Sequence, residues 1–196
     1  MEVKKLESHI RPLAMAAMIV AMAGAGLVLL QDIFSAVILS NPWKFYSLSA
    51  FTSVLGFFSN VAMWGGLAVF AFGMANSAMK NYVDAGILKA LFILACCVGG
   101  LYMMGSVMPA GAASLVFTIL GSIAMVGYVV LQVLVYVKIC KLPDFKSFAL
   151  WTMILFIVLG TNVILGWVPF LNILIGIAIA AATVFYVMEC NKIFGK

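Results

Sequence analysis

Few side chains in this sequence have the chemistry of a catalytic or metal site. The one histidine, His9, lies in a charged N-terminal segment, and the four cysteines have the spacing of neither a zinc site nor a disulfide framework. Motifs for a serine nucleophile, a zinc protease or a phosphate-binding glycine loop are absent. A carboxylate pair at membrane depth would need Asp32 and Glu189, which the topology below places on opposite sides. We therefore predict a protein that is not an enzyme and uses no metal or cofactor.

Polar side chains within the apolar runs are the remaining candidates for a functional site. An ionisable or amide group in lipid is costly, so it marks either a functional site or a hydrogen bond between helices. We predict that four such side chains line an outward-facing cavity and bind a small solute: Gln31, Asp32, Asn60 and Asn162. Asn172, at the start of the last run, lies near the same level. The alternatives are that Asp32 lies among lipid headgroups, and that the amides only bond helices to one another.

The composition requires lipid around the chain. Of the 196 residues, 66% are hydrophobic and 9% are charged, and the mean hydropathy is +1.24. Soluble domains are about half apolar and roughly a quarter charged, and a soluble fold of this size cannot hide so much apolar surface. We predict an all-α integral membrane protein with a single polytopic domain over residues 1–196. The basic residues are scattered rather than gathered on one face, which argues against nucleic acid as a partner.

Six apolar runs are long enough to cross a bilayer, for which a helix needs about 20 residues. They cover residues 13–39, 48–75, 85–108, 114–137, 148–168 and 170–188. Proline or a polar segment separates each run from the next. The break between the last two runs, at Gly166 to Pro169, is short and uncharged. A continuous run there would leave five helices or a re-entrant element.

The charge distribution orients the predicted bundle of six transmembrane helices. The two tails and the second and fourth loops carry ten of the eleven Lys and Arg residues, and the opposite side carries Lys44 alone. Lys89, near the start of the third run, is counted with the ten because its side chain can reach the interface. Cytoplasmic loops carry the Lys and Arg excess. We therefore predict both termini in the cytoplasm and residence in the cytoplasmic (inner) membrane.

Small residues follow one face of the first run. They recur every three or four residues, which is the spacing of a helix face: Ala14, Ala17, Ala21 and Gly24. Small faces let membrane helices pack closely. We predict helix packing here, either within one bundle or between two copies of the chain.

The polar residues at membrane depth favour a transporter or a solute-binding membrane subunit, with the lipid bilayer and a small solute as partners. The alternative is a non-catalytic structural or accessory subunit. Such a subunit would use its small-residue face to bind other membrane subunits or a second copy of itself.

Overall fold

The computed structural model describes residues 2–41, 43, 47–108, 111–166, 168 and 171–194, without the side chains of residues 2–11, 13–14, 78 and 191–194. Its elements are α1 (Glu2–Ser40), α2 (Leu48–Ala75), α3 (Ala85–Val107), α4 (Ala112–Ile139), α5 (Lys146–Leu165) and α6 (Leu171–Phe194), with short 3-10 helices η1 (Ala78–Asn81) and η2 (Pro143–Phe145). Six helices are long and apolar enough to cross a membrane. This confirms the prediction of an all-helical chain with six membrane-length helices.

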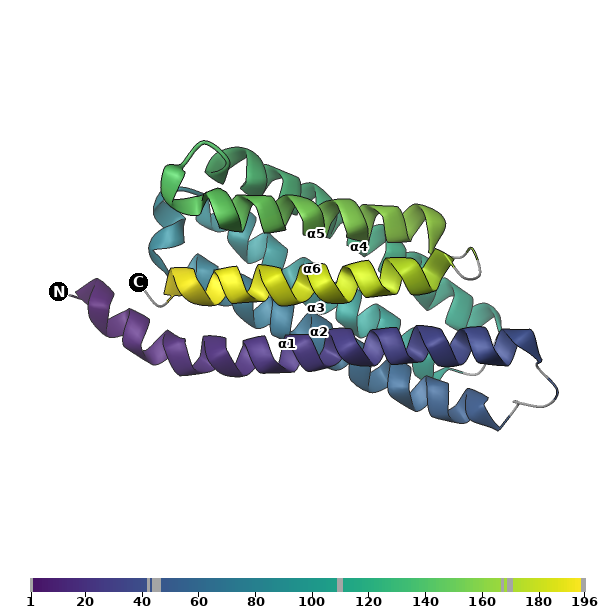
Figure 1. The fold of residues 1–196 in the computed structure, drawn as a ribbon. Helices are drawn as coiled ribbons and strands as arrows, with labels where there is room; N and C mark the ends of the chain where they lie inside the picture. Colours follow the sequence, from purple (N-terminus) through teal and green to yellow (C-terminus); the bar gives the residue numbers. More distant parts are fainter. Residues whose placement is uncertain are drawn as a thin grey trace.

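The helix bounds differ from the predicted spans mainly at the two ends of the chain. α1 begins at Glu2 rather than near residue 13, because the charged N-terminal segment is helical as well. Pro12 lies inside α1. Proline lacks a backbone N–H and crowds the preceding turn, so it bends a helix that continues through it; the first turns of α1 are inclined to the rest (Figure 1). α6 likewise continues to Phe194, beyond the predicted end at residue 188.

The six long helices form a ring in chain order. Each helix packs against the next one along the chain, and α6 returns to pack against α1. Successive helices are antiparallel, so both termini lie at one end, here called the terminal end, and the opposite end is called the distal end (Figure 1). α5 ends at Leu165 and α6 begins at Leu171. The last two apolar runs therefore form two separate helices, and the five-helix alternative is wrong.

The terminal half of the ring is filled by large side chains. Those that are fully buried include Phe70, Met74, Leu88, Leu91, Ile139, Phe148 and Tyr186. Rings from neighbouring helices stack here, with the centroids of Phe148 on α5 and Tyr186 on α6 separated by 5.4 Å. In lipid the hydrophobic effect gives helices little reason to associate, so dispersion contacts of this kind hold the ring together.

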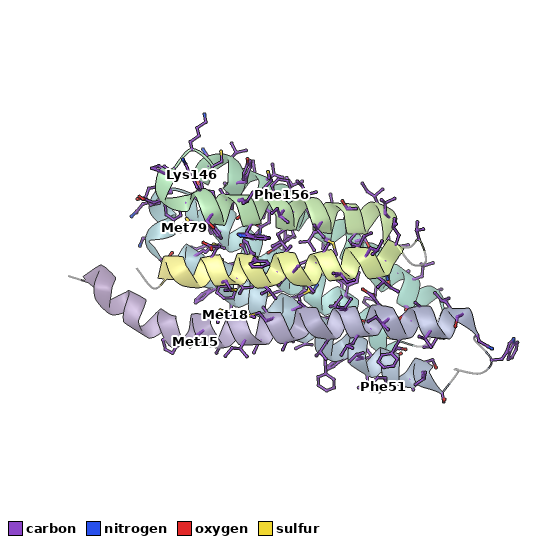
Figure 2. The ribbon with its side chains drawn as sticks, viewed as in Figure 1. Met15, Met18, Phe51, Met79, Lys146 and Phe156 are labelled. Carbon is purple, nitrogen blue, oxygen red and sulfur yellow. The ribbon has the colours of Figure 1, made fainter. Side chains whose placement is uncertain are left out.

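The outer surface of the bundle is apolar. Side chains along its flanks are mostly carbon (Figure 2), and large aliphatic residues are exposed on every long helix, among them Ile19, Ile123 and Ile164. Lys146 lies at the terminal end and Phe51 near the distal end (Figure 2). Soluble monomers rarely expose apolar surface on this scale. With the six apolar helices, the surface indicates a multi-pass membrane protein.

α1 and α2 approach each other closely at small residues. Three of the four residues predicted for packing are buried against α2: Ala17, Ala21 and Gly24. A Cβ atom on Gly24 would collide with the backbone of Met63, and one on Gly66 would lie 2.5 Å from the Ala21 Cβ. The side chain of Ala14 lies outside those the structure describes. The chain itself therefore covers the described part of this small-residue face.

Candidate functional site

A cavity occupies the distal half of the ring. Its volume is about 810 Å³, and residues of all six long helices line it. Small-molecule pockets typically have volumes of about 300–1,000 Å³. No charged side chain is found among the described residues that line it. Three of the four side chains predicted to share a cavity line this one: Gln31, Asn60 and Asn162.

The Gln31 side chain on α1 is held against α2. The Ser59 hydroxyl donates a hydrogen bond to the Gln31 Oε1 atom over 3.2 Å, and it also lies 3.0 Å from the Gly56 carbonyl oxygen. A Cβ atom on Gly56 would lie 2.8 Å from the Gln31 Nε2 atom. Glycine at this position therefore makes room for the amide. With its oxygen occupied by Ser59, Gln31 presents its NH₂ group as the free donor.

Asn60 and Asn162 approach the cavity from α2 and α5. The Asn60 NH₂ group donates to the Gly56 carbonyl oxygen over 2.8 Å, which leaves its side-chain oxygen as an acceptor. The Asn162 side chain has no hydrogen bond to another residue in the described part of the chain, and its Oδ1 atom lies against Gly166. Both amides therefore have hydrogen-bonding capacity to offer a solute.

Asp32 lies beside the cavity rather than in its lining. Its Oδ1 atom accepts a hydrogen bond from the Asn172 NH₂ group over 3.1 Å, and a Cβ atom on Gly176 would lie 2.5 Å from its Oδ2 atom. The half-buried carboxylate thus fits into a space left by a glycine on α6. Asn172 itself lines the cavity. Asp32 is therefore linked to the cavity by its hydrogen bond with Asn172. It does not lie at the end of its helix, because α1 continues to Ser40, about two turns beyond it.

Hydroxyl groups form the wall supplied by α3 and α4. The Ser106, Thr118 and Ser122 hydroxyls each donate to a backbone carbonyl of their own helix, over 2.8 to 3.0 Å. The Tyr102 hydroxyl lies 3.1 Å from the Ser122 hydroxyl, linking the two helices. A hydroxyl that donates to the backbone still has lone pairs to offer. This wall therefore presents hydrogen-bond acceptors.

The floor of the cavity, toward the terminal half, is apolar and aromatic. Met63, Trp64, Met125, Leu159 and Ile179 are buried and line it. The Trp64 ring packs edge-on against Tyr128, with 5.2 Å between centroids. Tyr128 is almost fully buried and does not line the cavity, so this pair separates the cavity from the packed half.

A buried polar cluster lies beneath this floor. The Gln132 NH₂ group donates to the Tyr128 hydroxyl over 2.8 Å and lies 3.4 Å from the Tyr186 hydroxyl. Two buried oxygens, Gln132 Oε1 and Thr183 Oγ1, have no hydrogen-bond partner within the described part of the chain. Because an unmet polar group in a low-dielectric interior is costly, each of these two oxygens needs a partner that the described part of the chain does not supply.

The described residues were compared with the requirements of a metal site. No group of three or more His, Cys, Asp or Glu side chains there is placed to hold a metal ion. What the cavity offers is shape, apolar contact and neutral hydrogen bonds. Comparison with protein-family models, with curated proteins and with solved structures found no match for this chain.

Sequence reasoning missed the hydroxyl wall and the cavity-facing role of Trp64. Ser114, Thr118 and Ser122 recur every four residues, which places them on one face of α4. That spacing was the available signal for a polar face. The glycines opposite Gln31 and Asp32 could not be recognised without knowing which helices pack together.

Proposed function

We propose that this chain has both termini in the cytoplasm and binds a small uncharged solute in its cavity, as a transporter or a solute-binding membrane subunit. The observation that carries the proposal is the convergence of four amides from four helices on one cavity: Gln31, Asn60, Asn162 and Asn172. Described residues satisfy only part of their hydrogen-bonding capacity. Since polar groups in an apolar medium require partners, the remaining capacity favours a hydrogen-bonding ligand.

The basic residues support the proposed orientation. The described Lys side chains lie in or beside the connections at the terminal end: Lys80, Lys89, Lys138, Lys141 and Lys146. Cytoplasmic segments carry such an excess. In that orientation the distal half, with its cavity, belongs to the outer half of the membrane.

The packing of α1 weakens the alternative of an accessory subunit. That alternative relied on a small-residue face available to another helix. α2 covers Ala17, Ala21 and Gly24 within the same chain, so these residues offer no free surface to a partner.

Thermal unfolding of the purified protein tests solute binding. A ligand that binds only the folded state raises its stability with concentration. Sugars, nucleosides, long-chain alcohols and cationic amines form the panel, and at least one uncharged member should raise the unfolding temperature. Asn162→Leu should remove that rise, because it removes an amide from the lining. The matched control is Thr161→Val on the same helix, whose hydroxyl bonds the Ile157 carbonyl and does not line the cavity.

Each other outcome contradicts a distinct part of the proposal. An equal rise in wild type and Asn162→Leu would place binding outside the cavity. A response to cationic amines alone would overturn the assignment of an uncharged solute. No response to the whole panel, with a membrane protein co-purifying in fixed ratio, would favour the accessory subunit.

A further inference from the structure

One wall of the cavity is also part of the outer surface of the bundle. Among the described lining residues, every exposed one lies on α4. Four of them are aliphatic: Leu115 is 59% exposed, Ile119 50%, Ile123 62% and Val126 47%. Lining residues on the other five helices are buried or half-buried. The cavity therefore opens along α4, next to apolar surface.

The opening lies on the α5 side of α4. On the α3 side, the Ser114 hydroxyl donates to the Gly105 carbonyl over 2.9 Å, and Tyr102 lies 3.1 Å from the Ser122 hydroxyl, so that seam is closed at the distal end. Between α4 and α5 the described contacts lie farther toward the terminal end. A Cβ atom on Gly160 would be 3.9 Å from Val129, and α5 ends soon after at Leu165, whereas α4 extends back to Ala112. The two helices diverge toward the distal end (Figure 1).

The lining is polarised along the axis of the bundle. Amides and hydroxyls such as Asn162, Asn172 and Ser106 lie toward the distal end, and Met63, Trp64 and Met125 form the floor. A molecule that fits this gradient has a hydrogen-bonding head and an apolar body. The head must be uncharged, because no described lining residue would neutralise a charge that loses its water.

We propose that the solute is a neutral amphipath that enters from the outer leaflet through the opening between α4 and α5. Its apolar body would lie against Met63, Trp64 and Met125, and its head among the distal amides. This inference rests on the proposed function of the same cavity and narrows its ligand class. A molecule already dissolved in the bilayer meets a wall of α4 that is mostly aliphatic, with the Thr118 hydroxyl as its one exposed polar group among the described lining residues.

Fluorescence quenching of Trp64 tests the proposal directly. Replacing Trp43, Trp151 and Trp167 with Phe leaves Trp64, on the cavity floor, as the only tryptophan. The full-length protein is reconstituted in phosphatidylcholine vesicles and titrated with 12-bromododecanol, whose bromine quenches indole on contact. The control protein keeps only Trp151, which stacks on Phe185 with 4.3 Å between centroids and does not line the cavity. A second titration uses 12-bromododecyltrimethylammonium.

Saturable quenching of Trp64 by the alcohol is the expected result. The concentration of alcohol in the bilayer that quenches half of the Trp64 fluorescence should be at least about tenfold lower than the concentration that quenches half of the Trp151 fluorescence. That ratio equals about 1.4 kcal/mol of preferential binding. The cation should give no saturable quenching of Trp64, which is buried within the bundle. Equal quenching of Trp64 and Trp151 by the alcohol would overturn the inference, because it would report partitioning into lipid only.

The outcomes separate this inference from the function on which it rests. If Trp64 is not quenched saturably but a sugar or nucleoside stabilises the protein, the ligand class and the route are wrong and the cavity function stands. If no uncharged solute acts in either experiment, both fail. Should the single-tryptophan proteins not fold, a diazirine derivative of dodecanol is photolysed with the unaltered chain. Labelling around Met63 and Met125 is then expected, and labelling spread over exposed residues of all helices would contradict the proposal.

Discussion

Asp32 lies beside the cavity and is joined to its lining by one hydrogen bond, from Asn172. The structure gives it a space opposite Gly176 and one amide donor, Asn172, from the helix that closes the ring. The hypothesis drawn from sequence made Asp32 a direct ligand of the solute. Its position instead favours a positioning role, in which the carboxylate fixes the orientation of the Asn172 side chain.

Two substitutions distinguish these roles. Asp32→Asn keeps an acceptor oxygen for Asn172, so we expect little change in the unfolding temperature or in stabilisation by solute. Asp32→Leu leaves the Asn172 amide without its acceptor, and an unmet buried polar group costs about 1–3 kcal/mol. Thermal unfolding with and without solute measures both effects. Loss of the solute response in a well-folded Asp32→Asn protein would restore the direct role of the carboxylate.

At the scale of helices, the contact between α1 and α2 should tolerate no added methyl group. In Gly24→Ala the new Cβ would meet the backbone of Met63, which cannot rotate away. Overpacking of this kind costs about 1–3 kcal/mol, or more where backbone must move. Gly26→Ala is the matched control on the same helix, because nothing beyond the neighbouring backbone of α1 lies within 4 Å of its Cβ position. A thermal scan in detergent compares the two, and equal melting would show that this face of α1 is not packed.

Helix bounds were predictable where an apolar run ends at polar residues on both sides. α2 spans the predicted residues 48–75 for that reason. The start of α1 was not predictable, because hydropathy marks the apolar part of a helix and gives no sign that a charged segment with a proline continues it. The helical ring in chain order likewise depends on α6 returning to α1, a contact that no local pattern contains.

The candidate site was predictable only in part, for a physical reason. An amide in an apolar run is conspicuous because a bond to its own helix, such as that of Asn60 to Gly56, meets only part of its hydrogen-bonding capacity. This drew attention to Gln31, Asn60 and Asn162. A hydroxyl can bond a carbonyl of its own helix, so Ser106 and Ser122 give no such signal. The pairing of Asp32 with Asn172 joins residues 140 positions apart, and it follows from the closure of the ring alone.

At the scale of the whole molecule, the two ends of the bundle should react differently in intact cells. Ser47 and Ala112 are exposed near the distal end, and Cys140 follows α4 at the terminal end. With Cys96, Cys97 and Cys190 replaced by Ala, a membrane-impermeant maleimide should label Ser47→Cys and Ala112→Cys but spare Cys140. Labelling of Cys140, with both engineered sites spared, would reverse the proposed orientation.

The buried cluster beneath the Trp64–Tyr128 floor makes a prediction about stability. Thr183 Oγ1 has no partner among the described residues. Thr183→Val keeps the shape of the side chain and removes that oxygen, so we expect a gain of up to about 1–3 kcal/mol. Thermal unfolding measures it. A lower unfolding temperature would mean that the hydroxyl bonds a group such as a water molecule.

The same cluster offers a way to distinguish a protein that only binds a solute from one that transports it. A protein that only captures a molecule gains nothing from unmet oxygens below a closed floor. A transporter must offer the solute new hydrogen bonds beyond the floor, because each hydrogen bond that the solute loses on leaving the cavity has to be replaced along the route. Thr183→Val should then capture as well as wild type and deliver more slowly. Solute binding and transport rate, measured in wild type and in Thr183→Val, would distinguish a solute-binding protein from a transporter.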